Sequence, residues 1–430
     1  MDIKPIVSSE RNLNGIDYFL FWAGVAISLA EIWAGGFLAP VGFCLGLLAI
    51  FLGHIIGNTF LGLGGLIGSK YGITSMVSVR PSFGIKGASI AAVLNIIQLI
   101  GWASILLIIA GQAGAVLGKP LGGIWASRKF WVVLIGMGTL FWALYTGEKV
   151  WKIMQYIACI AMLLVILMIT WIVFGKIDVN TLNIPRTRCM YFMTALDLVI
   201  AMPISFLPIV ADYSRFSKGK KSAFWNTWLG YFIISSWMYM LGLTATIVIG
   251  EEDPAVLMVN TLSVIGLAVP ALMMVVFSTI TSNFPDLYSA TCSMMNLSKK
   301  TNPKLFMWFV ALLTILVALV FPMGQYENYL LFIGAMFIPL FGVVLTDYFI
   351  IRRRMLKIED IDRDGGIYWY TKGVNIIAVV SWGIGFWVYI YFSYISKAFG
   401  GSLPSIITAG MLYYILMKFQ KTVRGQVENE

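Results

Sequence analysis

Long apolar runs alternate with short polar stretches along the whole chain, and many of the runs are long enough to cross a membrane. The stretch 154–174, for example, contains 21 residues without a charged side chain. A helix of about 20 apolar residues spans the roughly 30 Å hydrocarbon core of a bilayer. We therefore predict an all-α membrane protein with about twelve transmembrane helices. The predicted spans are 17–40, 44–68, 88–117, 130–147, 153–175, 190–213, 223–250, 256–287, 305–322, 326–350, 374–396 and 403–419.

Two of these spans are interrupted by residues that a continuous membrane helix rarely contains. The first has the carboxylate of Glu31 among small residues in the segment 24–36, and the second has Pro203 and Pro208 within the segment 201–208. Proline lacks an N–H group and clashes with the preceding turn, so it frees backbone carbonyls. At membrane depth such groups must be satisfied by protein or by a watery cavity. Broken helices at corresponding places in two halves point to the binding site of a secondary transporter.

The composition agrees with a membrane protein that carries no catalytic or metal centre. Hydrophobic residues make up 59% of the chain and charged residues 12%, whereas soluble domains carry about 25% charged residues. The mean hydropathy is +0.86. Segment 1–11 is polar and the first apolar run leads directly into further spans, so we expect no cleavable signal. We expect no cofactor, and we interpret the cysteines as packing thiols; they are Cys44, Cys159, Cys189 and Cys292.

The net charge of +10 raises the question of a nucleic-acid partner, and the distribution of the basic residues answers it. With the N-terminus inside, 23 of the 30 Lys and Arg residues fall on the inner side of the predicted spans and 7 on the outer side. Cytoplasmic loops carry such an excess of basic residues. We therefore expect both termini in the cytoplasm, a bacterial cytoplasmic membrane as the location, the lipid bilayer as a partner, and no nucleic acid.

The order of the spans predicts one transmembrane domain (1–430) built from two repeats. Spans one to five (17–175) and six to ten (190–350) each open with an interrupted helix. An odd number of spans per repeat makes the second set enter from the opposite side, which is the inverted-repeat geometry of alternating-access carriers. The last two spans (374–419) are predicted to be peripheral.

Polar residues on spans one and eight are candidates for a substrate or ion site. Glu31 lies about half way through span one, where a carboxylate costs a few kcal/mol and marks a functional site by default; the alternative is a hydrogen-bonded packing residue. On span eight, Ser278, Thr281 and Ser282 share one helix face. Hydroxyls and freed carbonyls are ligands that Na⁺ accepts, and the alternative is a helix–helix contact. Asp286, next to Pro285, is either a substrate contact or a group near the helix end.

Spans two, three and six offer further candidates. Gln98 and Trp102 are four residues apart and lie on one face of span three. The indole can stack on a planar ring, or it can simply pack. Ser205 and Phe206 adjoin the break in span six, and Asp197 lies nearer its outer end. His54, the single histidine, is either a neutral packing residue or a proton relay.

Several stretches resemble the nucleobase–cation–symport-1 family, which includes cytosine permease and the hydantoin transporter, and the similarity covers essentially the whole chain. These stretches are Trp33-Ala34-Gly35-Gly36, Gly68-Ser69-Lys70-Tyr71-Gly72-Ile73-Thr74, Arg80-Pro81-Ser82-Phe83-Gly84-Ile85-Lys86-Gly87, Gly101-Trp102, Ala211-Asp212-Tyr213-Ser214-Arg215-Phe216 and Asp347-Tyr348-Phe349. Three others are most similar to the CytX branch of hydroxymethylpyrimidine transporters: Ser28-Leu29-Ala30-Glu31-Ile32, Leu38-Ala39-Pro40 and Phe277-Ser278-Thr279-Ile280-Thr281.

The resemblance implies a LeuT-like fold with a 5+5 inverted repeat, and it implies roles for individual residues. Sodium would lie between spans one and eight, and Trp102 would be the stacking residue. At the position of the family's second aromatic wall this chain has Pro203, so Phe206 would take that role. At the position of a span-one aromatic residue of cytosine permease it has Ser28. The family's span-eight asparagine matches Asn283, with Asp286 close enough to share its role. The implied sodium ligands are the carbonyls of Gly24 and Ile27 with the hydroxyls of Ser278, Thr281 and Ser282.

Together these features predict a Na⁺- or H⁺-coupled importer of an aminopyrimidine, and the resemblance favours hydroxymethylpyrimidine, a thiamine precursor. Its ring would stack on Trp102 and its amine would donate to Glu31. Asn283, Ser205 and Gln98 would contact the ring nitrogens or the hydroxymethyl group. The alternatives are a cytosine, purine or hydantoin permease, a passive channel, and a membrane-embedded enzyme that uses Glu31, Asp286 and His54.

Overall fold

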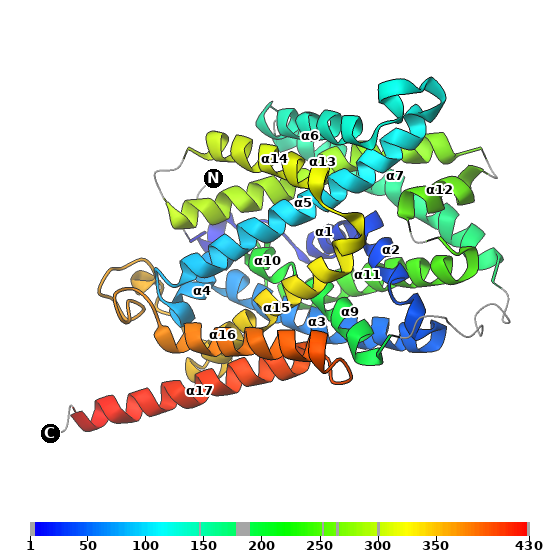
Figure 1. Cartoon of the computed structure of the whole chain (residues 1–430). Helices are drawn as coiled ribbons and strands as arrows, with labels where there is room; N and C mark the ends of the chain where they lie inside the picture. The colour runs from blue at the N-terminus through cyan, green and yellow to red at the C-terminus, as the bar shows by residue number, and fades with distance from the viewer. Residues whose placement is uncertain are drawn as a thin grey trace.

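The computed structural model describes residues 5–145, 148–177, 190–251, 253–263, 266–298 and 302–427, and these residues fold almost entirely into helices (Figure 1). Ten of the helical segments are long and apolar enough to cross a membrane, and one bent pair of shorter helices makes an eleventh candidate. The helices of the first half are α1 (Gly15–Ala26), α2 (Leu29–Gly36), α3 (Phe43–Tyr71), α4 (Ser75–Phe83), α5 (Ala88–Gly118), α6 (Arg128–Tyr145) and α7 (Glu148–Gly175). Those of the second half are α9 (Phe192–Ile204), α10 (Leu207–Ser214), α11 (Lys220–Ile249), α12 (Pro254–Leu262), α13 (Ala268–Leu297), α14 (Pro303–Val320), α15 (Tyr326–Leu345), α16 (Ile376–Ile390) and α17 (Ser402–Val427).

The predicted spans correspond to these helices with two differences. The fourth span is α6, which has 18 residues but begins with Arg128 and Lys129 in its first turn, so it falls outside the ten apolar segments. Both ends of the eighth span, 256 and 287, are wrong. A separate short helix, α12, covers residues 254–262, and α13 runs from Ala268 to Leu297. Pro254 at the start of α12, after the capping side chain of Asp253, explains this extra helix, because proline favours the first turn of a helix.

Large apolar side chains cover the outer surface of the bundle. Trp171 on α7 is 83% exposed, and Val320 at the end of α14 is 79% exposed. Water would disfavour such a surface, whereas lipid chains accept it. The surface is therefore that of a multi-pass integral membrane protein.

The break in the first span follows from local capping. Helix α1 ends at Ala26, and Ser28 has extended backbone angles (φ −143°, ψ 140°). The Ser28 hydroxyl accepts a hydrogen bond from the N–H of Ala30 at 3.2 Å, which is the role of an N-cap residue. A new helix therefore starts here, and the two halves of the span meet at 58°.

The break in the sixth span is present but milder than that in the first. Helix α9 ends at Ile204 and α10 begins at Leu207, yet residues 192–214 remain one span without a bend above 40°. The Ser205 hydroxyl donates to the carbonyl of Met202 at 2.6 Å. This hydrogen bond helps to satisfy a backbone carbonyl at the end of α9, where the helical pattern stops. The structure thus confirms the interruption and limits its size.

The two broken spans lie at the centre of the molecule. Helices α1 and α2 pack on α11, and α9 and α10 pack on α3, while α5 and α13 form the most extensive helix pair. Helices α16 and α17 lie together at one edge, next to α15 (Figure 1). The core is therefore a pair of interrupted helices enclosed by continuous ones.

The two longest polar stretches of the sequence pack against each other. Arg80 of α4 forms an ion pair with Asp362, and it also donates to Asn296 at the end of α13. Tyr370 and Arg352 both donate to the carbonyl of Pro81, at 2.6 and 2.8 Å. The segments 69–86 and 352–372 thus form one polar cap on the bundle.

Close contact between α2 and α11 depends on glycine, and this gives a test of the packing. A methyl group on Gly242 would fall within the van der Waals radius of the Ile32 carbonyl oxygen. Overpacking of this kind costs about 1–3 kcal/mol. We expect Gly242→Ala to lower the melting temperature of the detergent-solubilised protein, measured by tryptophan fluorescence. Gly383→Ala on α16, where a methyl group meets nothing within 4 Å, is the matched control. Equal melting temperatures for the two variants would contradict the packing.

Candidate substrate and ion site

A cavity of about 130 Å³ lies where the two broken spans meet α5, α7 and α13. Ligand pockets for drug-sized molecules occupy about 300–1,000 Å³, so this one suits a small solute. Its lining residues come from five segments of the chain. They are Phe21, Trp22, Gly24, Val25, Ile27, Ser28, Leu29, Ala30, Glu31, Trp102, Leu106, Ile109, Met162, Met202, Phe206, Ile209, Tyr213, Val275, Ser278, Thr279, Ser282, Pro285 and Asp286.

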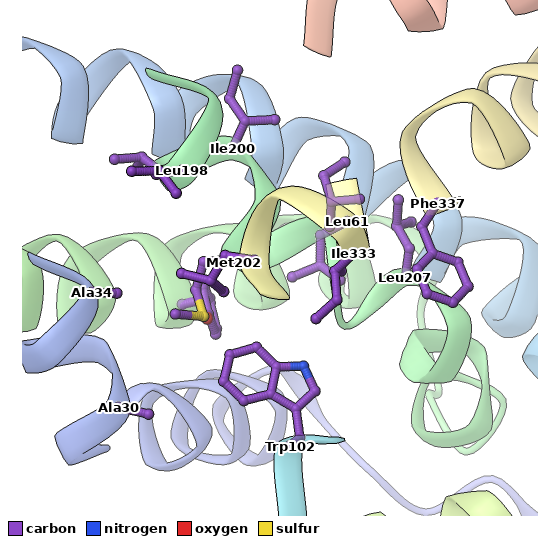
Figure 2. Close-up of a cluster of buried hydrophobic side chains, with 14 of the residues drawn as sticks. Ala30, Ala34, Leu61, Trp102, Leu198, Ile200, Met202, Leu207, Ile333 and Phe337 are labelled. Carbon is purple, nitrogen blue, oxygen red and sulfur yellow. The ribbon is translucent and has the colours of Figure 1, made fainter. Parts of the chain in front are cut away.

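Aromatic rings form much of the cavity wall. Trp102 points from α5 toward Met202 of α9 and Ile333 of α15 (Figure 2). Its ring meets those of Tyr326 and Tyr329 edge-on, with centroids 6.0 and 5.6 Å away. These edge contacts hold the indole in a fixed orientation.

The span-one aromatics Phe21 and Trp22, with Tyr213 of α10, also line the cavity, and the sequence analysis missed them. Phe206 packs against Trp22 and Tyr231, with ring centroids 5.8 and 5.4 Å away, and those two rings are 6.1 Å from each other. Helical spacing gave a usable signal for the first pair, because Phe21 lies about one turn before Gly24 and Val25 on the same helix.

Glu31 is in the first turn of α2 and only 2% exposed, yet it lines the cavity. Its carboxylate accepts hydrogen bonds from the hydroxyls of Tyr231 and Ser235, both on α11. The N-terminus of a helix also favours negative charge. These three contributions explain how a carboxyl group is tolerated at this depth.

A polar ridge of α13 faces the same cavity. Ser278, Ser282 and Asp286 are four residues apart and all line it, as helical spacing requires. Pro285 lies inside α13, which continues to Leu297. Asp286 is therefore in the middle of the helix and not near its end.

The predicted ion ligands are only partly brought together. Gly24 and Ile27, at the end of α1, line the cavity with Ser278 and Ser282. The last carbonyls of an α-helix lack i+4 partners within that helix, although the carbonyl of Gly24 accepts the N–H of Ile27 at 3.3 Å. The Thr281 side chain instead donates to the carbonyl of Ser278 at 2.9 Å. Thr281 is fully buried and is not among the lining residues.

Three residues that were predicted to contact the substrate lie behind the cavity wall. Gln98 donates to the carbonyl of Ser205 at 2.8 Å and to Asn95 at 2.9 Å, so it ties α5 to the break in span six. Asn283 donates to the carbonyl of Ala103 at 3.4 Å. Gln98, Ser205 and Asn283 are not among the lining residues. The oxygen atoms of the Gln98 and Asn283 amides have no partner among the described residues.

Asp197 has a structural role away from the cavity. Its carboxylate accepts the N–H groups of Gly401 and Ser402 at 2.5 and 2.9 Å. This is the capping arrangement for the start of a helix, here α17. The residue therefore fastens α9 to the peripheral helix pair.

The shape and the site define a class of protein: a secondary transporter, with a small cavity at the centre of a multi-pass helical bundle. Two solved structures of the transporter Mhp1 share its fold. The inward-facing form has a TM-score of 0.86 and 20% identity over 97% of this chain and 93% of that one. The closed form with bromovinylhydantoin has a TM-score of 0.83 and 20% identity, over 97% and 94%. The LeuT-like fold with its interrupted first and sixth helices is thereby confirmed.

The sequence relationship gives the family. The sequence profile of permeases for cytosine/purines, uracil, thiamine and allantoin matches residues 5–415. YxlA, a Bacillus subtilis protein assigned as a purine-cytosine permease, is 24% identical over 97% of this chain and 95% of its own length. The cytosine permease of Escherichia coli (strain K12) is 26% identical over 81% of each chain. The hydantoin permease of Microbacterium maritypicum is 24% identical over 88% of this chain and 82% of its own.

The chain belongs to this permease family, the nucleobase–cation–symport-1 family, as its sequence motifs predicted. It is a permease and not an enzyme, because the relatives are permeases and the structural neighbour is a transporter. The alternative of a membrane-embedded enzyme is thereby excluded.

Proposed function

We propose that this protein is a cation-coupled importer of an aminopyrimidine, with hydroxymethylpyrimidine as its substrate. The observation that carries the proposal is that two carboxyl groups, Glu31 and Asp286, line one small cavity with aromatic walls. An ionised carboxylate only accepts hydrogen bonds, and an exocyclic amine supplies N–H donors. A buried polar contact of this kind also discriminates strongly against analogues that lack it.

In this proposal the pyrimidine ring stacks on Trp102, with Phe206 on the other side and its amine toward Glu31. Ser28, at the break in span one, and Asp286 of α13 are placed to contact the remaining polar groups. Gln98, Ser205 and Asn283 act on the substrate indirectly, because their hydrogen bonds hold α5 against the sixth span and α13.

The coupling ion in this proposal is Na⁺, bound between the end of α1 and the α13 ridge. An ion at that place would tie the two helices together and favour one conformation over the other through its differential affinity. The two repeats, 17–175 and 190–350, would then move relative to each other around the cavity, with 374–419 as peripheral helices. Both termini would face the cytoplasm of a bacterium, as the distribution of Lys and Arg favours.

A second candidate function is transport of cytosine, a purine or a hydantoin. The names of the relatives favour it, and the cavity size suits the one-ring solutes among these, cytosine and a hydantoin. Competition separates the two: labelled hydroxymethylpyrimidine uptake should resist excess cytosine, uracil and hydantoin. Complete inhibition by cytosine at equal concentration would favour the second candidate.

Thermal unfolding of the purified protein tests the substrate and the ion together. A ligand at 100 times its Kd stabilises the folded state by about 2.7 kcal/mol, so the melting temperature should rise with hydroxymethylpyrimidine. We expect a larger rise in Na⁺ than in K⁺ at equal ionic strength. A panel of cytosine, uracil, hypoxanthine, allantoin and benzylhydantoin provides the comparison. A rise with one of these and none with hydroxymethylpyrimidine would contradict the proposed substrate.

A further inference from the structure

A chain of polar contacts leads from the cavity into the protein, away from the proposed ion site. It begins at Glu31, whose two carboxyl oxygens contact the hydroxyls of Tyr231 and Ser235. The Ser235 oxygen lies 2.6 Å from Nε2 of His54 on α3. Nδ1 of His54 lies 2.9 Å from the carbonyl oxygen of Ile50. Three helices, α2, α11 and α3, thus meet through one hydrogen-bonded chain.

The number of protons in this chain can be counted. Its four contacts each need one hydrogen atom between the two heavy atoms. Tyr231 and Ser235 supply one each, neutral His54 supplies one, and an ionised Glu31 supplies none. The ionised, neutral-histidine form is therefore one proton short of satisfying all four contacts.

The hydrogen-bond roles also show which contacts compete for a hydrogen atom. A carbonyl oxygen only accepts, so the hydrogen of neutral His54 is on Nδ1 and Nε2 is an acceptor. The Ser235 hydroxyl can then donate to Glu31 or to His54, but not to both. One added proton completes the chain in either of two ways. A protonated Glu31 donates to Ser235, which donates to His54, or a doubly protonated His54 donates to Ser235, which donates to Glu31.

The surroundings make the form of this chain that lacks the proton unfavourable. Glu31 is 2% exposed, and His54 and Tyr231 are fully buried. Asp286 of α13 lines the same cavity as Glu31, and the other titratable groups that face this chain among the described residues are phenols. Tyr239 of α11 meets the His54 ring at 5.1 Å, and Tyr326 of α15 donates to the carbonyl of Ala30 at 3.1 Å. None of the ion pairs among the described residues involves Glu31 or His54. A buried carboxylate without a counter-ion and with an incomplete hydrogen-bond chain is unfavourable.

We propose that Glu31, Ser235 and His54 form a binding site for one proton, which is shared between the carboxyl group and the imidazole. The site opens into the cavity only at Glu31. If the proposed function holds, this proton is coupled to substrate. An amine that donates to Glu31 favours the ionised carboxylate, which is the form of the site without its proton, and it leaves the Ser235 hydroxyl free to donate to His54. Substrate binding therefore favours release of the proton.

The single histidine of the chain allows a test that needs no substrate. The full-length protein, purified with a tag free of histidine and labelled with ¹⁵N-histidine, gives ring signals from one site only. We expect the Nε2 signal of the wild type to change between about pH 5 and 9. In Glu31→Gln the amide donates to Ser235 without a titratable proton, so this change should disappear. Ser235→Ala should remove it as well, because it breaks the chain.

Ser236→Ala is the matched control. Ser236 is the neighbouring residue on α11, it is also buried, and its hydroxyl has no partner among the described residues. It should keep the wild-type titration. An identical His54 titration in the wild type and in Glu31→Gln would overturn the shared proton.

A second experiment measures the coupling to substrate. We expect the Kd of hydroxymethylpyrimidine to fall as the pH rises toward the point where the site loses its proton, by up to tenfold per pH unit. His54→Gln should remove this dependence, since an amide nitrogen near the place of Nε2 donates to Ser235 without an added proton. Ser236→Ala should keep it.

The two experiments separate the two proposals. No binding of hydroxymethylpyrimidine at any pH, with the expected histidine titration, contradicts the proposed substrate and leaves the proton site supported. Substrate binding with the same pH dependence in the wild type and in His54→Gln overturns the coupling. The histidine titration is measured without substrate, so its result does not depend on whether hydroxymethylpyrimidine binds.

Discussion

Replacing Trp102 by alanine is expected to lower uptake of the substrate by at least tenfold. Stacking of a base on an aromatic side chain is worth about 1–3 kcal/mol, and a loss of 1.4 kcal/mol is a tenfold change in affinity. Trp102 is also held in its orientation by the edges of Tyr326 and Tyr329, so the wall is preformed. Uptake of labelled hydroxymethylpyrimidine by cells, divided by the amount of transporter in the membrane, measures the effect.

Two further variants separate stacking from folding. Trp102 is 8% exposed, and truncating a buried tryptophan costs about 3–5 kcal/mol of stability. Trp102→Phe keeps an aromatic face and should retain part of the uptake. Trp171→Ala removes an indole that is 83% exposed on α7 and should transport normally. Wild-type uptake by Trp102→Ala would remove this residue from the site.

The double variant Ser278→Ala/Ser282→Ala is expected to raise the Na⁺ concentration needed for half-maximal uptake by at least tenfold. Both residues line the same cavity as Gly24 and Ile27. A polar contact to a charged group is worth about 1.5–3 kcal/mol, so the loss of even one such contact gives a tenfold effect. The measurement is uptake into proteoliposomes as a function of external Na⁺, with choline as the replacement cation.

Ser289→Ala is the control for this variant. Ser289 is buried two turns further along α13 and is not among the lining residues, so its loss should leave the Na⁺ dependence unchanged. Thr281→Ala adds a comparison within the predicted ligand set, because its hydroxyl is bonded to the carbonyl of Ser278. An unchanged Na⁺ dependence in the double variant would contradict an ion site at this place. If uptake then still follows a pH gradient, the proton would be the coupling ion.

Local features of the sequence were sufficient to predict most of the helices and both interruptions. Charge-free segments such as 154–174 are too long for anything but a span, and Ser28 and Pro203 act on the backbone next to them. The start of the eighth span was wrong, because the apolar stretch at 254–262 continues the hydropathy of the span. Hydropathy alone does not distinguish a short helix at the membrane surface from the first turns of a crossing helix.

The chemistry of the predicted site residues could be read from the sequence, but the direction of their side chains could not. In the structure Glu31, Trp102 and Asp286 line the cavity, whereas Gln98 and Asn283 point into contacts between helices. Gln98 is one helical turn from Trp102, so the spacing places them on one face. A helix face is wider than the wall of a small cavity, and only the packing of neighbouring helices decides which of its residues reach the opening.

The sequence by itself determined the membrane location, the order of the spans, the two breaks and the family. These depend on hydropathy, on capping, on proline and on motifs read along the chain. The tertiary structure alone decided which side chains meet. Glu31, His54 and Ser235 are separated by up to 204 positions and come together only when α2, α3 and α11 pack. Such contacts leave no local pattern, since each depends on the rotation and the depth of three helices at once.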